Sequence, residues 1–165
     1  FVFQEKSRRP FLSDRAEALG VPQGPERKRL VDGKPIVLSD GRQIEPDEVL
    51  GEPVPGTKLV HVGDSARTDN LVAVCRDADA LVIEATYVER EADMADRFGH
   101  LTAAQSARLA VDAGVKNLFL VHISRRYSQR EIAHEARAIF PNTFVPHDLD
   151  QYRIMRNAVE RVASS

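Results

Sequence analysis

The sequence has no long apolar run, only one cysteine and no excess of positive charge. No uninterrupted hydrophobic stretch approaches the roughly 20 residues that a membrane-spanning helix needs, and no charged-then-apolar leader resembles a secretion signal. The single Cys75 excludes a disulfide framework and favours a reducing compartment, so we expect a cytoplasmic protein without a membrane partner. A formal net charge of −2 argues against a protein that binds nucleic acid over its whole surface.

What is present predicts a soluble globular protein of about one domain, with 165 residues, 42% hydrophobic and 29% charged. Positive charge is local, and on charge alone a solvated surface is its favoured explanation; the clusters are Lys6-Arg8-Arg9, Arg27-Lys28-Arg29 and Arg125-Arg126. The chain opens without an initiator Met on "FVFQEK", which alternates apolar and polar residues as a half-buried strand does. We therefore expect it to be cut from a longer protein.

Two regions differ in composition. Residues 1–56 hold seven of the nine prolines and six of the nine glycines, and Asp40-Gly41 lies between short apolar runs as in a β-hairpin turn. Few apolar residues there repeat at a helical or strand period, so we expect an initial strand followed by a protruding arm. Residues 57–165 form the second region.

Apolar runs and helical patterns alternate in residues 57–165. We expect strands at 58–62, 80–85, 117–122 and 143–147, and helices at 68–78, 100–114, 128–140 and 150–162. Thr102 with Gln105, and Ser128 with Glu131, have the spacing of capping boxes, and Gly114 suits a helix C-terminus. Strands that alternate with helices across short connections indicate an α/β fold with a mainly parallel sheet.

The three central strands of this pattern end in Asp64, Glu84 and His122. Ligand sites of open α/β sheets form beyond the carboxyl ends of the strands, where loops from several elements converge. Asp, Glu and His bind divalent ions and transfer protons. The pattern thus indicates one site at this edge of the sheet.

Three further features point to the same edge. His100 follows Gly99 and precedes the Thr102 cap, so it is either a surface loop residue or a proton donor oriented by a carboxylate such as Glu84. Arg126 follows His122 closely and suits a phosphate oxygen, as does the helix start at Ser128. These residues alone predict a metal-assisted hydrolase of a phosphate ester. The ligand set is incomplete, because no two of the five histidines are two or four residues apart.

Four motifs in order, "GDS", "EAT", "GHLTAAQSA" and "HISRRY", resemble the ribonuclease Z (tRNase Z) family of the metallo-β-lactamase superfamily. "VPQGP" and "DGRQIEPDEVLGEP" resemble the exosite arm of that family. The resemblance implies the C-terminal half of an αββα sandwich with a protruding arm. It also implies a zinc-dependent endoribonuclease that removes the 3′ trailer of precursor tRNA through metal-activated water, working as a homodimer.

The resemblance also implies roles for individual residues. Asp64 would bridge two Zn²⁺ ions (with Mn²⁺ or Mg²⁺ as alternatives), His122 would bind one of them, and His100, oriented by Glu84, would protonate the leaving 3′ oxygen. The residues expected near the scissile phosphate are Ser124, Arg126 and Tyr127. The arm around Val21–Arg29, with Arg27, Lys28 and Arg29, would grip the tRNA through its phosphates.

The sequence departs from the family pattern in several places. Ser65 replaces the usual Thr, Ile83 stands where His is common, and Leu101 replaces Ser. The His-x-His-x-Asp-His motif that supplies most zinc ligands is absent from these residues. We therefore expect this chain to need the N-terminal half of the same enzyme and to be inactive alone.

Two alternatives remain open. One is a hydrolase of the same fold that acts on another phosphodiester or ester, although a small substrate needs no remote grip. The other is a non-catalytic fragment, or one half of a two-chain assembly, that binds without cutting. A half-fold would also expose the sheet face that packs on its other half, so we expect tight self-association.

Overall fold

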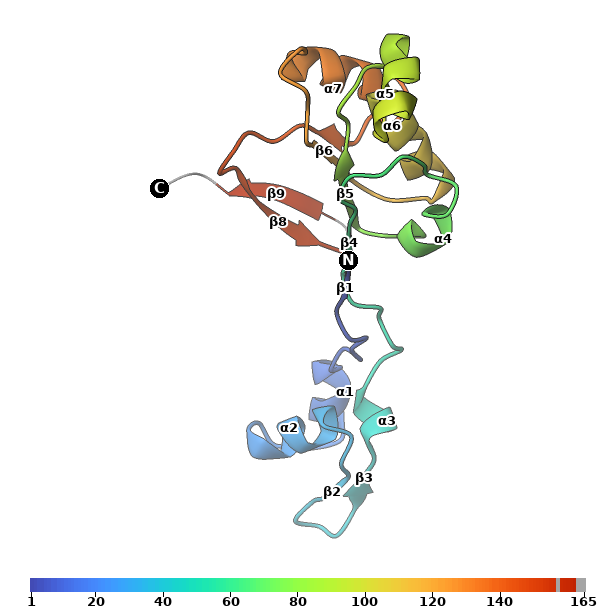
Figure 1. Ribbon diagram of the computed structural model, residues 1–165. Helices are drawn as coiled ribbons and strands as arrows, with labels where there is room; N and C mark the ends of the chain where they lie inside the picture. Colours follow the sequence, from blue (N-terminus) through green and yellow to red (C-terminus); the bar gives the residue numbers. More distant parts are fainter. Residues whose placement is uncertain (157, 163–165) are drawn as a thin grey trace. The chain divides into compact units, whose positions relative to one another are not determined.

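A computed structural model describes residues 1–156 and 158–162, and the chain divides into two compact units (Figure 1). One unit is Phe1–Glu5 together with Thr57–Ser165, called here the sheet unit. The other is Lys6–Gly56, called here the arm unit. The first strand therefore belongs to the sheet unit, although it precedes the arm in the sequence. None of the helices among the described residues is long and apolar enough to cross a membrane.

The sheet unit is built on a five-stranded sheet in the order β1-β4-β5-β6-β7. These strands are β1 (Val2–Gln4), β4 (Lys58–His61), β5 (Ala80–Glu84), β6 (Leu118–Val121) and β7 (Thr143–Phe144). β1 is antiparallel to β4, and the other four strands are parallel. The mainly parallel sheet expected from the sequence is confirmed, with each expected strand in place.

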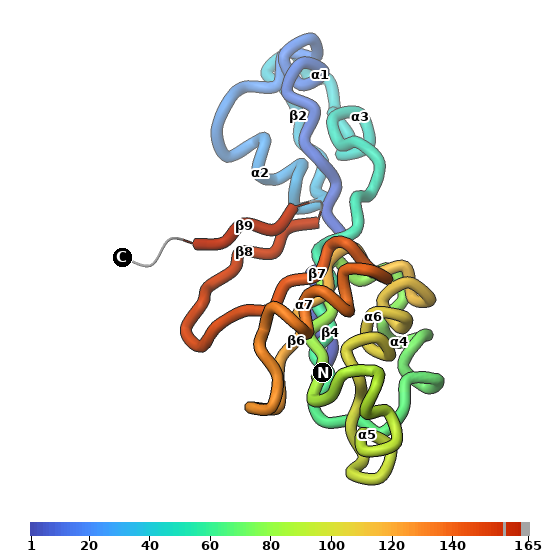
Figure 2. Tube along the Cα trace, turned by 90° about the horizontal axis from the view of Figure 1, so that it is seen from above, coloured from blue at the N-terminus to red at the C-terminus, as the bar shows by residue number. Residues whose placement is uncertain are grey.

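Helices cover one face of this sheet (Figures 1 and 2). They are α4 (Val72–Cys75), the 3₁₀ turn η1 (Glu89–Glu91), α5 (Ala92–Phe98), α6 (Ala103–Asp112) and α7 (Gln129–Arg137). Buried Leu81, Ile83 and Leu120 pack with residues of α6 and α7, as does the core residue Cys75. The capping box of Thr102 and Gln105 is confirmed, and the side chain of Ser128 caps α7. Two helices differ from expectation: α4 is much shorter than 68–78, and the sequence pattern did not reveal α5.

The expected final helix at 150–162 is wrong in the described part of that range, while its residue Asn157 lies outside the described residues. The chain forms an antiparallel hairpin of β8 (Gln151–Met155) and β9 (Ala158–Val162). Apolar residues of this stretch fit both a helical and an alternating period. Packing against the sheet favours the hairpin, because the ring of Tyr152 in β8 packs edge-on against Phe119 and Phe144, at centroid distances of 5.1 and 5.8 Å.

The hairpin covers only part of its face of the sheet. Phe3 pairs with Leu59 in the β1–β4 register and is 58% exposed, and the terminal Phe1 is 86% exposed. A hollow of about 530 Å³ lies between β1 and Ile154 of the hairpin. The end of the sheet at β1 thus presents apolar rings to solvent.

The arm unit has more regular structure than its sequence suggested. It contains α1 (Ser13–Ala18), α2 (Pro25–Val31), the hairpin of β2 (Ile36–Val37) and β3 (Gln43–Ile44), and α3 (Pro46–Val49). The turn at Asp40-Gly41 is confirmed, with Gly41 at φ 86°. Prolines at the first turns of α2 and α3 begin these helices, a position that needs no N–H donor. A small core includes Leu30, Ile36, Ile44 and Val49, so the unit has a hydrophobic interior of its own.

Candidate active site

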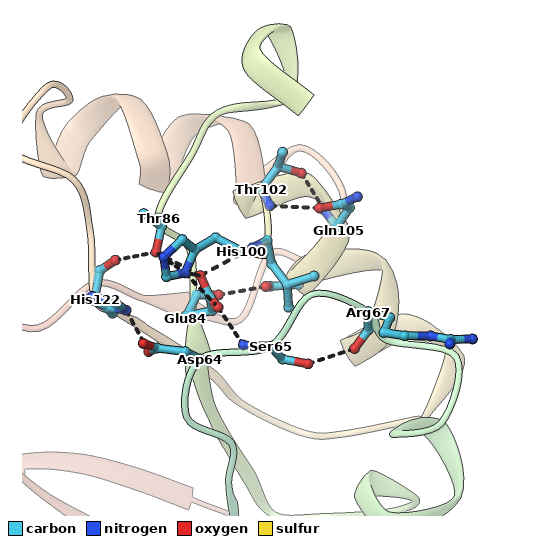
Figure 3. Close-up of polar contacts among 11 residues, drawn as sticks. Asp64, Ser65, Arg67, Glu84, Thr86, His100, Thr102, Gln105 and His122 are labelled. Carbon is cyan, nitrogen blue, oxygen red and sulfur yellow. Dashed lines mark hydrogen bonds and ion pairs between the residues drawn. The ribbon is translucent and has the colours of Figure 1, made fainter. Parts of the chain in front are cut away.

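The strand ends of the sheet unit bring Asp64, Glu84 and His122 together with His100 (Figure 3). Glu84 is the last residue of β5, His122 follows β6 directly, and Asp64 lies in the loop after β4. Nδ1 of His122 is 2.8 Å from Oδ1 of Asp64, and Nδ1 of His100 is 3.0 Å from Oε2 of Glu84. The four residues form two carboxylate–imidazole pairs at one edge of the sheet.

The carboxylate of Glu84 is the buried anchor of the site, with 1% of the residue exposed. Ser65 donates its backbone N–H to Oε1 at 2.6 Å, and Leu101 donates its N–H to Oε2 at 3.2 Å. The hydroxyl of Thr86 lies 2.7 Å from Oε2. Donors on several sides hold the carboxylate in one orientation. Because Leu101 acts here through its backbone, its departure from the family's Ser leaves this contact intact.

His100 lies between two helix ends. Gly99 ends α5 in a left-handed conformation with φ 74°, and Thr102 caps the start of α6. Glu84 engages Nδ1, and among the described residues no hydrogen bond engages Nε2. The ring lies edge-on to that of His122 at a centroid distance of 5.3 Å. The arrangement leaves Nε2 to exchange a proton with a substrate or to bind an ion.

His122 has a left-handed backbone, with φ 53°. This conformation is uncommon for residues other than Gly, although Asn, Asp and His adopt it more often than most, and it costs roughly 1–2 kcal/mol. The hydroxyl of Thr86 lies 2.9 Å from the carbonyl oxygen of His122, which ties this strand end to the Glu84 side of the site. The strained turn places the imidazole beside Asp64, and strain of this kind is common at functional sites.

Asp64, His100 and His122 fit a divalent ion. Each offers one ligand atom, and these atoms all lie within 4.8 Å of one another. Two imidazole nitrogens and a carboxylate oxygen form a donor set typical of Zn²⁺ and similar transition metals. The side chains of Asp64 and His122 are 64% and 50% exposed, so the group is open to solvent and to further ligands.

The loop after His122 carries Ser124, Arg126 and Tyr127, and Glu91 holds two of these three. Oε2 of Glu91 accepts a hydrogen bond from the Tyr127 hydroxyl at 2.6 Å and one from Nη1 of Arg126 at 3.1 Å. Burial, and then the neighbouring Glu91 carboxylate, raise the pKa of Tyr127 above its usual value. Ser124 lies nearby, with its backbone N–H directed to the carbonyl of Thr86 at 3.3 Å. The loop is thereby fixed to η1 and to the end of β5.

In the arm unit, the three basic residues of α2 differ in their contacts and in their exposure to solvent. Arg27 donates from Nη2 to the carbonyl of Val21 at 3.2 Å, and its guanidinium lies 5.7 Å from the ring centroid of Phe11. Lys28 and Arg29 are exposed, and no ion pair among the described residues engages them. Arg27 therefore serves the packing of its own unit, while Lys28 and Arg29 present their charges to solvent.

Sequence reasoning assigned no role to Thr86, to the Ser65 and Leu101 amides, or to Glu91. A signal for Thr86 was present, because Glu84 and Thr86 are two residues apart and emerge on the same side of an extended chain. Nothing local indicates that Glu91 meets Tyr127, since 36 residues separate them.

Comparison with known proteins gives consistent matches. A family model described as a beta-lactamase superfamily domain matches residues 29–123. Ribonuclease Z of Bradyrhizobium diazoefficiens is 49% identical over 150 residues, which cover 91% of this chain and 50% of that protein. Ribonuclease Z of Bradyrhizobium sp. (strain ORS 278) is 50% identical over 154 residues, which cover 93% of this chain and 51% of that protein. The chain thus spans about half the length of the curated relatives it matches.

The fold has a counterpart among solved structures. The metallo-beta-lactamase fold protein YhfI from Bacillus subtilis matches with a TM-score of 0.50 and 20% identity, over 56% of this chain and 40% of that chain. At this identity the match shows the fold alone, which is the fold expected from the four motifs.

Proposed function

The chain belongs to the beta-lactamase superfamily, and from this premise we propose that it is part of an endoribonuclease that removes the 3′ trailer of precursor tRNA. The observation that carries the proposal is the convergence of Asp64, Glu84, His100 and His122 at one edge of the sheet. The names of the relatives, all ribonuclease Z, supply the substrate class.

The proposed cofactors are two Zn²⁺ ions per active site, with Mn²⁺ or Mg²⁺ as alternatives. Asp64 and His122 would hold them from this chain, and the remaining ligands would come from the part of the relatives that this chain does not cover. Bound divalent ions would activate water and neutralise charge on the phosphate.

His100 is the proposed proton donor to the leaving 3′ oxygen of the tRNA. Glu84 holds Nδ1, which fixes the tautomer and directs Nε2 outward. The oxygen that leaves the phosphorus would take its proton from Nε2, and the resulting imidazole would be protonated again from solvent. Three further donors hold the Glu84 carboxylate, which keeps the pair in place through the cycle.

Phosphate binding is assigned to the loop after His122. Arg126 supplies a planar guanidinium and Ser124 a hydroxyl, while Tyr127, whose hydroxyl donates to Glu91, would hold the loop in position near the phosphate. In the arm unit, Lys28 and Arg29 are the proposed contacts to tRNA phosphates, while Arg27 contacts Val21 within its own unit.

Two finer assignments are a homodimer, which rests on the family resemblance, and a cytoplasmic location, which rests on the single cysteine. The buried, free thiol of Cys75 is consistent with a reducing compartment. These two assignments are independent of the chemistry proposed for the site.

The test is a cleavage assay with a precursor tRNA labelled in its trailer. The chain is assayed alone and together with the part of the Bradyrhizobium diazoefficiens ribonuclease Z that it does not cover. We expect cleavage only in the combined sample, with a 3′ hydroxyl on the tRNA product. An assembled, metal-loaded pair that leaves the precursor intact would refute the proposal.

A further inference from the structure

The outer face of α7 carries three basic side chains for which the described residues provide no carboxylate partner. Arg130, His134 and Arg137 are exposed and spaced four and three residues apart, which places them on the same side of the helix. No hydrogen bond or ion pair among the described residues engages the side chains of Arg130 and His134. Arg137 donates Nε to the carbonyl of Thr143 at 2.9 Å, a neutral partner that leaves its charge uncompensated.

Most other arginines of the sheet unit are paired with acids. Arg90 pairs with Glu131, Arg108 with Glu89, and Arg126 with Glu91. The pattern continues away from the helices in the pairs Arg67–Asp69, Arg153–Glu160 and Arg161–Asp150. Against this background, the outer face of α7 presents positive charge without an acidic partner among the described residues, while Glu131 and Glu135 of the same helix contact Arg90 and backbone N–H groups of Glu89 and Ala104. Such a face attracts anions.

Two neighbouring depressions lie beside these charges, and His122 is among the residues that line the second. One depression of about 620 Å³ is lined by α7 residues that include Arg130, His134 and Arg137, with Val145 opposite. A second, of about 240 Å³, is lined by residues that include His122, Ile123 and Pro146. Gln129 lines both, and its amide donates to the carbonyl of Pro146 at 3.2 Å, which fixes the wall that they share. Together they form what we call the α7 groove.

We propose that the α7 groove binds the phosphodiester backbone of the single-stranded 3′ trailer of the substrate. This inference rests on the proposed function, which supplies an RNA strand that leaves the site. From Arg130 to Arg137 the helix rises about 10 Å, enough for two or three phosphates of one strand.

The chemistry of the lining indicates the kind of contact. The described lining of the first depression includes no Phe, Tyr or Trp on which a base could stack, and its apolar residues are Ala133, Ala138 and Val145. Binding there would be sequence-independent, which suits a trailer that varies in sequence better than a tRNA body of fixed shape. Asp148 in the second depression opposes the binding of an anion, so its charge works against the affinity.

The binding test uses fluorescence anisotropy of a short, labelled single-stranded RNA with the 165-residue chain at several salt concentrations. Arg130→Gln removes one phosphate contact, so we expect affinity to fall about fourfold near 0.15 M salt and the salt slope to fall by about 0.7. Arg130→Glu should weaken binding further, and Asp148→Asn should strengthen it. The matched control is Arg76→Gln, an exposed arginine outside the α7 groove whose side chain forms no ion pair among the described residues.

A second experiment, a cleavage assay, distinguishes failure of this inference from failure of the proposed function. In the assembled enzyme, Arg130→Gln should slow cleavage of a precursor with a long trailer and spare one with a single-nucleotide trailer. If no form cleaves RNA but Arg130→Gln still weakens RNA binding selectively, the groove stands and the nuclease assignment falls. Should the Arg130 and Arg76 variants behave alike in both assays, the groove is refuted whatever the enzyme cleaves.

Discussion

Nδ1 of His100 lies 3.0 Å from Oε2 of Glu84, although the two residues are 16 positions apart and belong to different segments. The Glu84 side chain is 1% exposed and that of His100 is 22% exposed. One partner is therefore fixed in the interior while the other reaches the surface. This relationship distinguishes an oriented histidine from a loop histidine, and it makes the role of His100 testable.

In the assembled enzyme, His100→Ala should lower turnover about 10²–10⁴-fold, because general acid catalysis contributes on that scale. Glu84→Gln should lower turnover less, since it loosens the imidazole without removing it. Bound metal is counted by mass spectrometry in each variant. His100 lies close enough to Asp64 and His122 to act as a ligand, so the metal content distinguishes the two roles.

The control for the His100 and Glu84 variants is His61→Gln, which alters a half-buried histidine of β4 outside the candidate site. It should retain both turnover and metal. Complete loss of bound metal in His100→Ala would assign His100 as a ligand and overturn its role as the proton donor.

Asp64→Asn should weaken Zn²⁺ binding by this chain by more than about 100-fold, because it removes the anionic member of the donor set. Isothermal titration calorimetry of the isolated chain measures this without any assay of activity. Asp69→Asn is the matched control, since Asp69 is an exposed carboxylate of the same loop that pairs with Arg67. Equal affinities in the two variants would remove Asp64 from the metal site.

More of the candidate site than of the surrounding fold could be predicted from the sequence. Asp64, Glu84 and His122 are each adjacent to a short apolar run, and parallel strands bring such ends to one edge. Local patterns could not distinguish a helix from the β8–β9 hairpin. The hairpin is favoured by packing of Tyr152 on Phe119 and Phe144, whose rings lie far from it in the sequence.

The helices of the arm unit were missed for a related reason. They are short, and the contacts that stabilise them lie between elements, as when Leu30 of α2 packs with Val49 of α3. A helix of four to seven residues shows little periodicity, and tertiary packing supplies most of its stability. The capping boxes of α3 and α6 are local signals, and only that of α6 was recognised from the sequence.

The stability of the sheet unit should depend on pH through Glu89. The hydroxyl of Thr102, and then the guanidinium of Arg108, lower the pKa of Glu89 below its usual value. A lowered folded-state pKa contributes stability above the unfolded pKa, near 4.3, and that stability is lost as the pH falls through the folded pKa. Since the side chain is 45% exposed, solvent screening limits the gain to less than about 1 kcal/mol.

Urea unfolding of the wild type and of Glu89→Gln at several pH values measures this contribution. The difference in unfolding free energy should be constant near neutrality and vanish at pH values well below the folded pKa. Glu52→Gln is the control, an exposed carboxylate of the arm unit whose replacement should have little effect at any pH. A difference that grows on acidification would contradict the sign of the shift.

Phe3→Ser should reduce self-association of the chain, because Phe3 is a large apolar side chain exposed on the uncovered part of the sheet. Sedimentation velocity over a range of concentrations measures the association. Phe98→Ser is the matched control, since Phe98 is 56% exposed but lies on α5, on the helical side of the unit. A wild-type chain that stays monomeric at high concentration would refute the expectation.

The left-handed backbone at His122 implies that stability and activity select for different residues at this position. Glycine would adopt φ 53° without the steric penalty of a Cβ, and the folded chain would gain from the exchange. It would also lose the imidazole beside Asp64. Selection for thermal robustness alone would favour glycine at this position, whereas the metal site proposed above requires the imidazole of His122 at the end of β6.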